Sequence, residues 1–155
     1  MTFNTYGNKE NQSLLLIPGL GVSYEIFLPL IELLKDKYYI VAVGIDGFLL
    51  GQESQFTSVD DQAIQATQYI RENLNGHMDV AYGLSLGGKI LSRIMERNEI
   101  VIDHAIMDAA PLLPLPQMEC EPDSILPKSQ RVDLLSLHGF LEIRVPFALF
   151  RCVVG

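Results

Sequence analysis

Short apolar runs alternate with segments of helical periodicity over the first two thirds of the chain. Each apolar run is continuous, which is typical of a strand buried on both faces of a parallel sheet. Four such runs predict strands at residues 13–17, 39–43, 78–82 and 103–109. Apolar residues recur at helical spacing in three further segments, which predicts helices at 23–34, 58–74 and 86–97. This alternation predicts an α/β fold, in which helices flank a parallel sheet on both faces.

Local signals mark where the first two of these helices begin and end. Ser23 is expected to cap the first helix, and Ser58 to begin the second. Asn75-Gly76 favours the backbone conformation that ends a helix, so it predicts the end of the second one. The first helix is expected to bury one side, which consists of Ile26, Phe27, Leu30, Ile31, Leu33 and Leu34.

The pattern changes in the last third of the chain, where prolines crowd and the alternation of strands and helices does not resume. The prolines are Pro111, Pro114, Pro116, Pro122, Pro127 and Pro146. Apolar stretches at 134–137 and 145–154 have no clear helix or strand boundaries. We therefore expect a core at residues 1–116, followed by an atypical, irregular C-terminal tail at 117–155.

The most informative segment lies between the third expected strand and the third expected helix. There, Gly83-x-Ser85-x-Gly87 has the spacing of a nucleophile elbow, a sharp strand-to-helix turn that exposes a serine hydroxyl. Glycines are needed because such a turn brings neighbouring backbones too close for a Cβ. The strained serine backbone is held by the strand before it and the helix after it. Ser85 is therefore a candidate nucleophile.

The composition limits the class of protein and its partners. With 155 residues, 48% of them hydrophobic and 19% charged, the chain can form one folded domain with a core. Its formal net charge of −8 repels phosphate backbones, so no nucleic-acid partner is expected. The sequence has neither an N-terminal apolar signal core nor an apolar run long enough to cross a membrane. Cys120 and Cys152 have no metal-ligand spacing and are expected to be unpaired thiols in a cytoplasmic protein.

Acyl transfer is the chemistry that best fits the segment around Ser85. The backbone N–H of Leu86, at the start of the helix, would form half of an oxyanion hole. The other half is expected from the loop Pro18–Gly21, whose glycines let backbone amides approach a substrate oxygen. Both segments follow expected strands, and loops at the carboxyl ends of neighbouring parallel strands share one crevice.

Phosphate binding is an alternative for the same segment. Gly83-x-x-x-x-Gly88-Lys89 matches the start of a P-loop, and Asp108 ends an apolar strand as a metal-binding aspartate does. The residue after the lysine should be Ser or Thr to hold magnesium, but it is Ile90. Because the group that positions the cation is absent, nucleotide binding is the weaker hypothesis.

Three segments in this order resemble the α/β-hydrolase superfamily. They are Leu14–Gly21, Asp46–Ser54 and Tyr82–Gly88, and the likeness covers residues 13–116. The resemblance implies a hydrolase that acts on an ester, thioester or similar acyl substrate through a serine nucleophile, with no cofactor and no metal. Its partner would be a small-molecule acyl or ester substrate.

The resemblance also assigns roles to single positions. Ser85 matches the nucleophile, and Leu20 and Leu86 match the positions whose backbone N–H groups form the oxyanion hole. Two positions depart from the usual pattern. Pro18 stands where many members have a histidine, and Leu50 stands where a glycine is more usual.

A serine nucleophile needs a base, and in this superfamily an acid and a histidine follow it in the chain. Asp108 is a possible acid, because some members take their acid from the end of this strand. His138 is the only histidine downstream of the core and is a possible base. His77 and His104 stand at the amino ends of expected strands, away from Ser85, and are expected to be surface residues.

Residues 117–155 do not resemble the cap and the final strands that usually follow in this superfamily. We hypothesise that the chain is a truncated or frame-shifted hydrolase with an unrelated tail. The sheet would then have an exposed edge, through which the protein would self-associate. Two functions stay open: a serine hydrolase, and a catalytically inactive remnant that binds ligands or partners.

Overall fold

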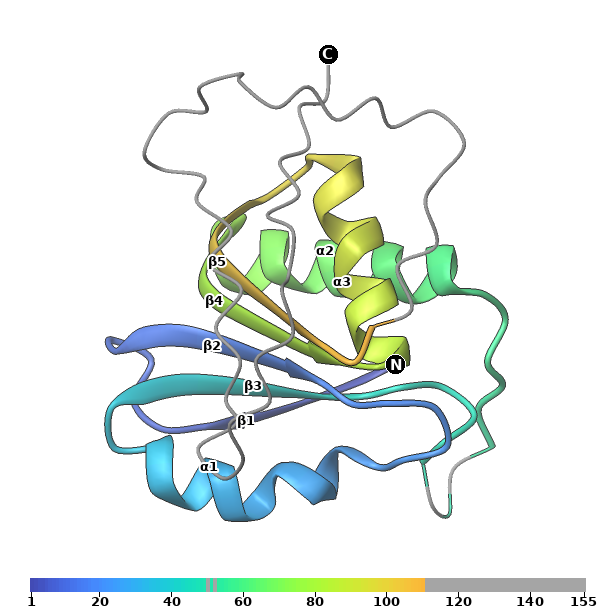
Figure 1. Ribbon diagram of the computed structural model, residues 1–155. Coiled ribbons are helices and arrows are strands. Elements are labelled where there is room, and N and C mark those ends of the chain that lie inside the picture. The colour runs from blue at the N-terminus through green and yellow to red at the C-terminus, as the bar shows by residue number, and fades with distance from the viewer. Residues whose placement is uncertain (50, 52, 111–155) are drawn as a thin grey trace, which may run out of the picture.

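The computed structural model describes residues 1–49, 51 and 53–110. In this part of the chain, five strands form one sheet in the order β1-β3-β2-β4-β5 (Figure 1). The strands are β1 (Thr2–Tyr6), β2 (Gln12–Ile17), β3 (Tyr38–Gly44), β4 (His77–Leu84) and β5 (Val101–Asp108). The helices are the 3₁₀ helix η1 (Tyr24–Phe27), α1 (Leu28–Leu34), α2 (Val59–Asn73) and α3 (Leu86–Arg97). The structure therefore confirms the predicted α/β fold, and the four predicted strands match β2 to β5.

Helices cover both faces of the sheet, as the continuous apolar runs predict. In Figure 1, α1 lies below the sheet, and α2 and α3 lie above it. Successive residues of one strand supply the two cores, since Leu14 and Leu16 pack with Ile31 of α1, whereas Leu15 and Ile17 pack with residues of α2 and α3. Such a strand is apolar on both sides, which is why it has no alternating pattern.

Strand β1 was not predicted, and it makes the sheet mixed rather than wholly parallel. It runs antiparallel to β3, with Thr2 opposite Gly44 and Tyr6 opposite Ile40, while all other strand pairs are parallel. The sequence Thr-Phe-Asn-Thr-Tyr has only two aromatic residues among polar ones, as an edge strand allows. Phe3 is anchored by stacking on Tyr69 of α2, with ring centroids 3.9 Å apart.

The first predicted helix differs from the structure. Ser23 caps the short 3₁₀ helix η1, by accepting a hydrogen bond from the N–H of Glu25 at 3.5 Å, and α1 follows. The predicted buried side is wrong for Ile26 and Leu33, which are 45% and 78% exposed. A 3₁₀ helix has three residues per turn and an α-helix 3.6, so one periodic stripe cannot run through both.

Helix α2 begins and ends where the sequence predicts. The Ser58 hydroxyl accepts a hydrogen bond from the N–H of Asp61 at 3.0 Å, which caps the first turn. At the other end, Asn75 and Gly76 have φ angles of 53° and 73°, and the N–H of Gly76 donates to the Ile70 carbonyl at 3.1 Å. Left-handed residues of this kind close a helix by satisfying its last carbonyls.

A side-chain clasp joins β2 to β4 near their amino ends. The Asp79 carboxylate accepts hydrogen bonds from the N–H and the hydroxyl of Ser13, both at 2.7 Å. In return, the N–H of Asp79 donates to the Ser13 hydroxyl oxygen at 2.9 Å. Partial burial alone would raise the pKa of Asp79, but the hydrogen bonds from Ser13 outweigh it, and the pKa lies below its ordinary value of 3.8.

The boundary at residue 116 and the tail at 117–155 lie outside the described residues. Strand β5 pairs with β4, and no other described strand lies on its outer side. Self-association through this edge stays a prediction. None of the helices in the described part of the chain is both long enough and apolar enough to cross a bilayer.

Removing the Ser58 cap should lower the stability of the fold. Ser58→Ala leaves the N–H of Asp61 without its acceptor, so we expect the free energy of unfolding to fall by about 1 kcal/mol. Urea denaturation measures the change. The matched control is Ser58→Asp, which keeps an acceptor at the cap and should stay close to the wild-type stability. Equal losses in both variants would contradict the role of the cap.

The clasp between Ser13 and Asp79 should make stability depend on pH. Asp79→Asn weakens the acceptor, so we expect a loss of about 1 kcal/mol at pH 7. Because the folded-state pKa is depressed, the contribution of the carboxylate is complete well above pH 3.8 and disappears as the pH falls through the folded-state pKa. Urea denaturation from pH 7 to pH 3 should therefore show the two proteins converging. Asp36→Asn, at an exposed turn, is the control. If the stability difference between the wild type and Asp79→Asn stays constant with pH, the Asp79 carboxylate is not the source of the pH dependence.

Candidate active site

Ser85 occupies the sharp turn that the sequence predicts. Strand β4 ends at Leu84 and helix α3 begins at Leu86, so Ser85 is the only residue between the two elements. Its φ of 50° and ψ of −110° lie outside the regions that residues with a side chain ordinarily adopt. Such a conformation persists only where the surrounding structure enforces it, and it is frequent at active sites.

Close backbone contacts enforce this turn. A Cβ added at Gly87 would overlap the carbonyl oxygen of Ile17 and would lie 2.6 Å from that of Pro18. A Cβ at Gly83 would lie 2.5 Å from the carbonyl oxygen of Gly87. Only glycine fits at both positions, and the first turn of α3 is therefore packed directly against the end of β2.

Hydrogen bonds hold the backbone of Ser85 on both sides. Its N–H donates to the carbonyl oxygen of Asp108 at 2.7 Å, which ties the turn to the end of β5. Its own carbonyl oxygen accepts from the N–H groups of Gly88 and Lys89 at 3.0 and 3.2 Å. The N–H of Leu86, at the first helical position, has no acceptor within the helix and is thus suited to bind an external anion.

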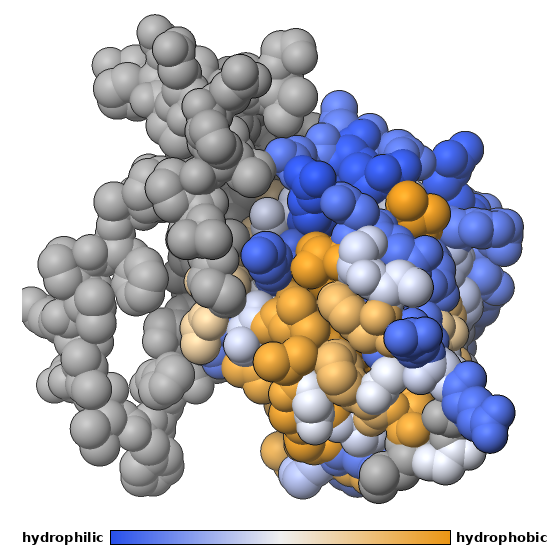
Figure 2. Space-filling view, turned by 90° about the vertical axis from the view of Figure 1, so that its right-hand side faces the viewer, coloured by the Kyte–Doolittle hydropathy of each residue, from blue (hydrophilic) through white to orange (hydrophobic). Residues whose placement is uncertain are grey.

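The loop Pro18–Gly21 lies beside the serine, as the sequence predicts for a shared crevice. A Cβ at Gly19 would be 3.6 Å from the Cβ of Ser85, so the two backbones are close neighbours. Gly21 has a φ of 69°, which lets the loop turn away from the sheet. The side chain of Leu20 is 67% exposed at this end of the sheet. Figure 2 views the molecule from the side where the strands end, and apolar residues gather there.

Asp108 ends β5 at the same edge of the sheet as Ser85. Its carboxylate accepts a hydrogen bond from the Tyr82 hydroxyl at 2.8 Å. Burial and this hydrogen bond both raise the pKa of Tyr82, so the phenol stays a neutral donor. Tyr82 was not among the residues predicted to contribute to the site. Its contact with Asp108 follows from the register of β4 and β5, which pairs Leu84 with Asp108. This register places the end of β5 beside the residues that precede Ser85.

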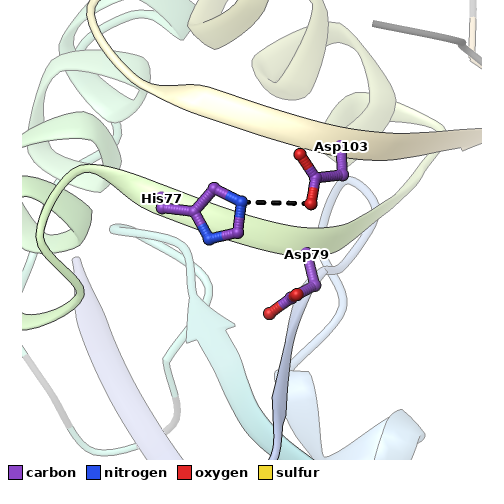
Figure 3. Close-up of side chains that lie close together, drawn as sticks. All are labelled: His77, Asp79 and Asp103. Carbon is purple, nitrogen blue, oxygen red and sulfur yellow. Dashed lines mark hydrogen bonds and ion pairs between the residues drawn. The ribbon is translucent and has the colours of Figure 1, made fainter. Parts of the chain in front are cut away.

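The described histidines lie away from Ser85. His77 is the first residue of β4, and a rise of about 3.3 Å per residue puts it roughly 25 Å from the serine. Its ring lies 3.1 Å from a carboxylate oxygen of Asp103 (Figure 3). His104 is exposed, in the first half of β5. Both are thus surface residues, as predicted, and His138, the possible base, lies outside the described residues.

The local backbone does not support the nucleotide-binding alternative. A P-loop is an extended glycine-rich loop whose N–H groups surround phosphate oxygens before the helix begins. Here the N–H groups of Gly88 and Lys89 already donate to the carbonyl oxygen of Ser85, and a single residue separates β4 from α3. Too little free backbone is left at this turn to surround a phosphate.

Known proteins match this chain in structure but not in sequence. No family model and no curated protein matches the sequence. Solved structures do match, among them a protein described as an α/β hydrolase family member from Desulfitobacterium hafniense, with a TM-score of 0.65 and 23% identity over 68% of this chain and 43% of the other. A lipase-esterase related protein from Clostridium acetobutylicum matches with a TM-score of 0.59 and 20% identity, over 68% of this chain and 45% of the other.

A carboxylesterase from Bacillus subtilis also matches in structure, with a TM-score of 0.56 and 23% identity over 69% of this chain and 39% of the other. The chain thus spans about two fifths of the length of the solved structures that it resembles. These TM-scores, together with identities of 20–23%, indicate a shared fold over the part of each structure that this chain covers. The chain has the fold of the α/β hydrolases, the superfamily that its sequence resembles.

Proposed function

We propose that this protein is a serine hydrolase that acts on an ester, thioester or similar small acyl substrate. The observation that carries the proposal is the backbone of Ser85, held at a φ of 50° between β4 and α3. Such strain raises a hydroxyl above the end of the sheet, where a substrate can reach it. The neighbouring Gly19 supports the proposal, because it brings a second loop within contact distance of the serine.

The proposed reaction begins with attack by the Ser85 hydroxyl oxygen on the acyl carbon of the substrate. Negative charge then develops on the acyl oxygen, and the N–H groups of Leu86 and Leu20 are the proposed donors that stabilise it. The leaving group departs with a proton, an acyl-enzyme forms, and water hydrolyses it. The apolar surface at this end, which includes Leu20, suits the hydrocarbon part of an acyl group.

We propose Asp108 as the acid and His138 as the base. The serine hydroxyl is a weak nucleophile until a base takes its proton, and the base must itself be oriented. Asp108 suits the orienting role, because it lies at the edge of the sheet that carries Ser85 and because Tyr82 fixes one of its carboxylate oxygens. In this scheme the protein needs no cofactor and acts on a small molecule in the cytoplasm.

A specific observation favours a second candidate, a protein with this fold that binds an acyl ligand without cleaving it. Both histidines in the described part of the chain lie far along the strands from Ser85. A serine with no base would still have the neighbouring loop Pro18–Gly21 and the proposed oxyanion donors, which could bind the acyl group. The two candidates differ in one property, the reactivity of the Ser85 hydroxyl.

A fluorophosphonate probe separates the two candidates, because it forms a covalent bond only with an activated serine. We expect one equivalent of label on the wild-type protein and none on Ser85→Ala, since that hydroxyl is the proposed nucleophile. Ser92→Ala is the matched control, because Ser92 belongs to the same helix α3. An unlabelled, folded wild-type protein would support the binding protein. Undiminished labelling of Ser85→Ala would place the nucleophile elsewhere.

The proposed base can be tested with the same probe. Substituting His138 removes the acceptor of the serine proton, so we expect His138→Ala to slow the labelling by about 10²–10⁴-fold. His104→Ala is the control, because His104 is exposed on β5 and should leave the rate unchanged. If His138→Ala is labelled as fast as the wild type, another group activates Ser85.

A further inference from the structure

A second cluster of chemically active side chains lies at the opposite end of the sheet from Ser85. It consists of His77 and Asp79 on β4 and Asp103 on β5 (Figure 3). One nitrogen or oxygen atom of each residue lies within 4.8 Å of the other two. His77 and Asp79 are about 20–25 Å along β4 from the serine, so the cluster is not part of the proposed active site.

Strand geometry brings the three side chains together. His77 and Asp79 are two residues apart on one strand, the spacing at which side chains project on the same side. The parallel register pairs His77 with Val101 and Val80 with His104, which places Asp79 beside Asp103 on the neighbouring strand. The three donors thus stand on two adjacent hydrogen-bonded strands, which form a rigid support.

Two of the three donors are already oriented. One carboxylate oxygen of Asp79 is fixed by the N–H and the hydroxyl of Ser13, each at 2.7 Å. Hydrogen bonds from neighbouring groups to a ligand carboxylate are typical of metal sites, where they hold the ligand in place. The His77 ring lies 3.1 Å from Asp103, and Figure 3 shows it turned toward that carboxylate.

Charge at the cluster is unbalanced. Two carboxylates lie side by side, and among the described residues neither forms an ion pair with a lysine or an arginine. Within the described residues, the single ion-pair partner of the two carboxylates is His77, which pairs with Asp103 and carries a positive charge only when it is protonated. A divalent cation would neutralise both carboxylates and would replace the histidine proton.

We propose that His77, Asp79 and Asp103 bind one zinc ion. The donor set of one imidazole nitrogen and two carboxylate oxygens suits a first-row transition metal better than calcium or magnesium, which prefer oxygen ligands alone. Zinc takes such ligands at about 2.0–2.2 Å, with water in the fourth position. The side chains of His77 and Asp103 are 46% and 38% exposed, so they can turn the short distance that brings the three donors onto one ion.

The experiment is zinc binding by the full chain, after treatment with a chelator, measured by equilibrium dialysis. We expect one equivalent of zinc per chain, with binding weakened about 10–100-fold in both His77→Gln and Asp103→Asn. His104→Gln is the matched control, because it removes an exposed histidine next to Asp103 in sequence without touching the cluster. Magnesium should compete poorly for the site.

A measurement on the wild-type protein keeps the test independent of folding in the variants. Zinc should protect His77 from acylation by diethylpyrocarbonate, as read by mass spectrometry, while His104 stays reactive. Absence of zinc binding would overturn the proposal. So would binding that leaves His77 reactive and is unchanged in both variants, since the ion would then lie on other residues, such as the cysteines.

Discussion

The close approach of α3 to the end of β2 constrains the whole carboxyl end of the sheet. Gly87 lies so near the Ile17 carbonyl that no side chain fits between them. Because Gly87 follows Ser85 by two residues, this contact fixes both the start of the helix and the turn before it. The loop Pro18–Gly21 leaves β2 at the same place. One contact between two backbones therefore determines how the serine and the neighbouring loop face each other.

The two ends of the sheet have different chemistry. At the carboxyl end, backbone strain, helical N–H groups and apolar surface surround a hydroxyl. At the amino end, an exposed imidazole lies beside two half-buried carboxylates, one of which is oriented by Ser13. The strands hold the cluster and the serine about 20–25 Å apart. Binding of a cation at one end and reactivity of the serine at the other are therefore separable properties.

The sequence predicts what depends on neighbours in the chain, and it misses what depends on register. Strands β2 to β5 and the turn at Ser85 carry local signals, namely continuous apolar runs and glycine spacing. Strand β1 is polar, and its partner β3 lies more than thirty residues away, so no local pattern marks it. The contact between Tyr82 and Asp108, and the cluster at His77, likewise exist only once β4 and β5 are aligned.

The strained backbone of Ser85 also bears on the choice between the two proposed functions. A glycine at this position would adopt a φ of 50° without the cost of about 1–3 kcal/mol that a side chain incurs there. A turn that served only to connect β4 with α3 would thus be more stable without the serine. Asn75, Asn98 and Ala109 also have positive φ angles, so this cost alone does not separate the two functions, but it is the trade-off expected if Ser85 is kept for the reactivity proposed above.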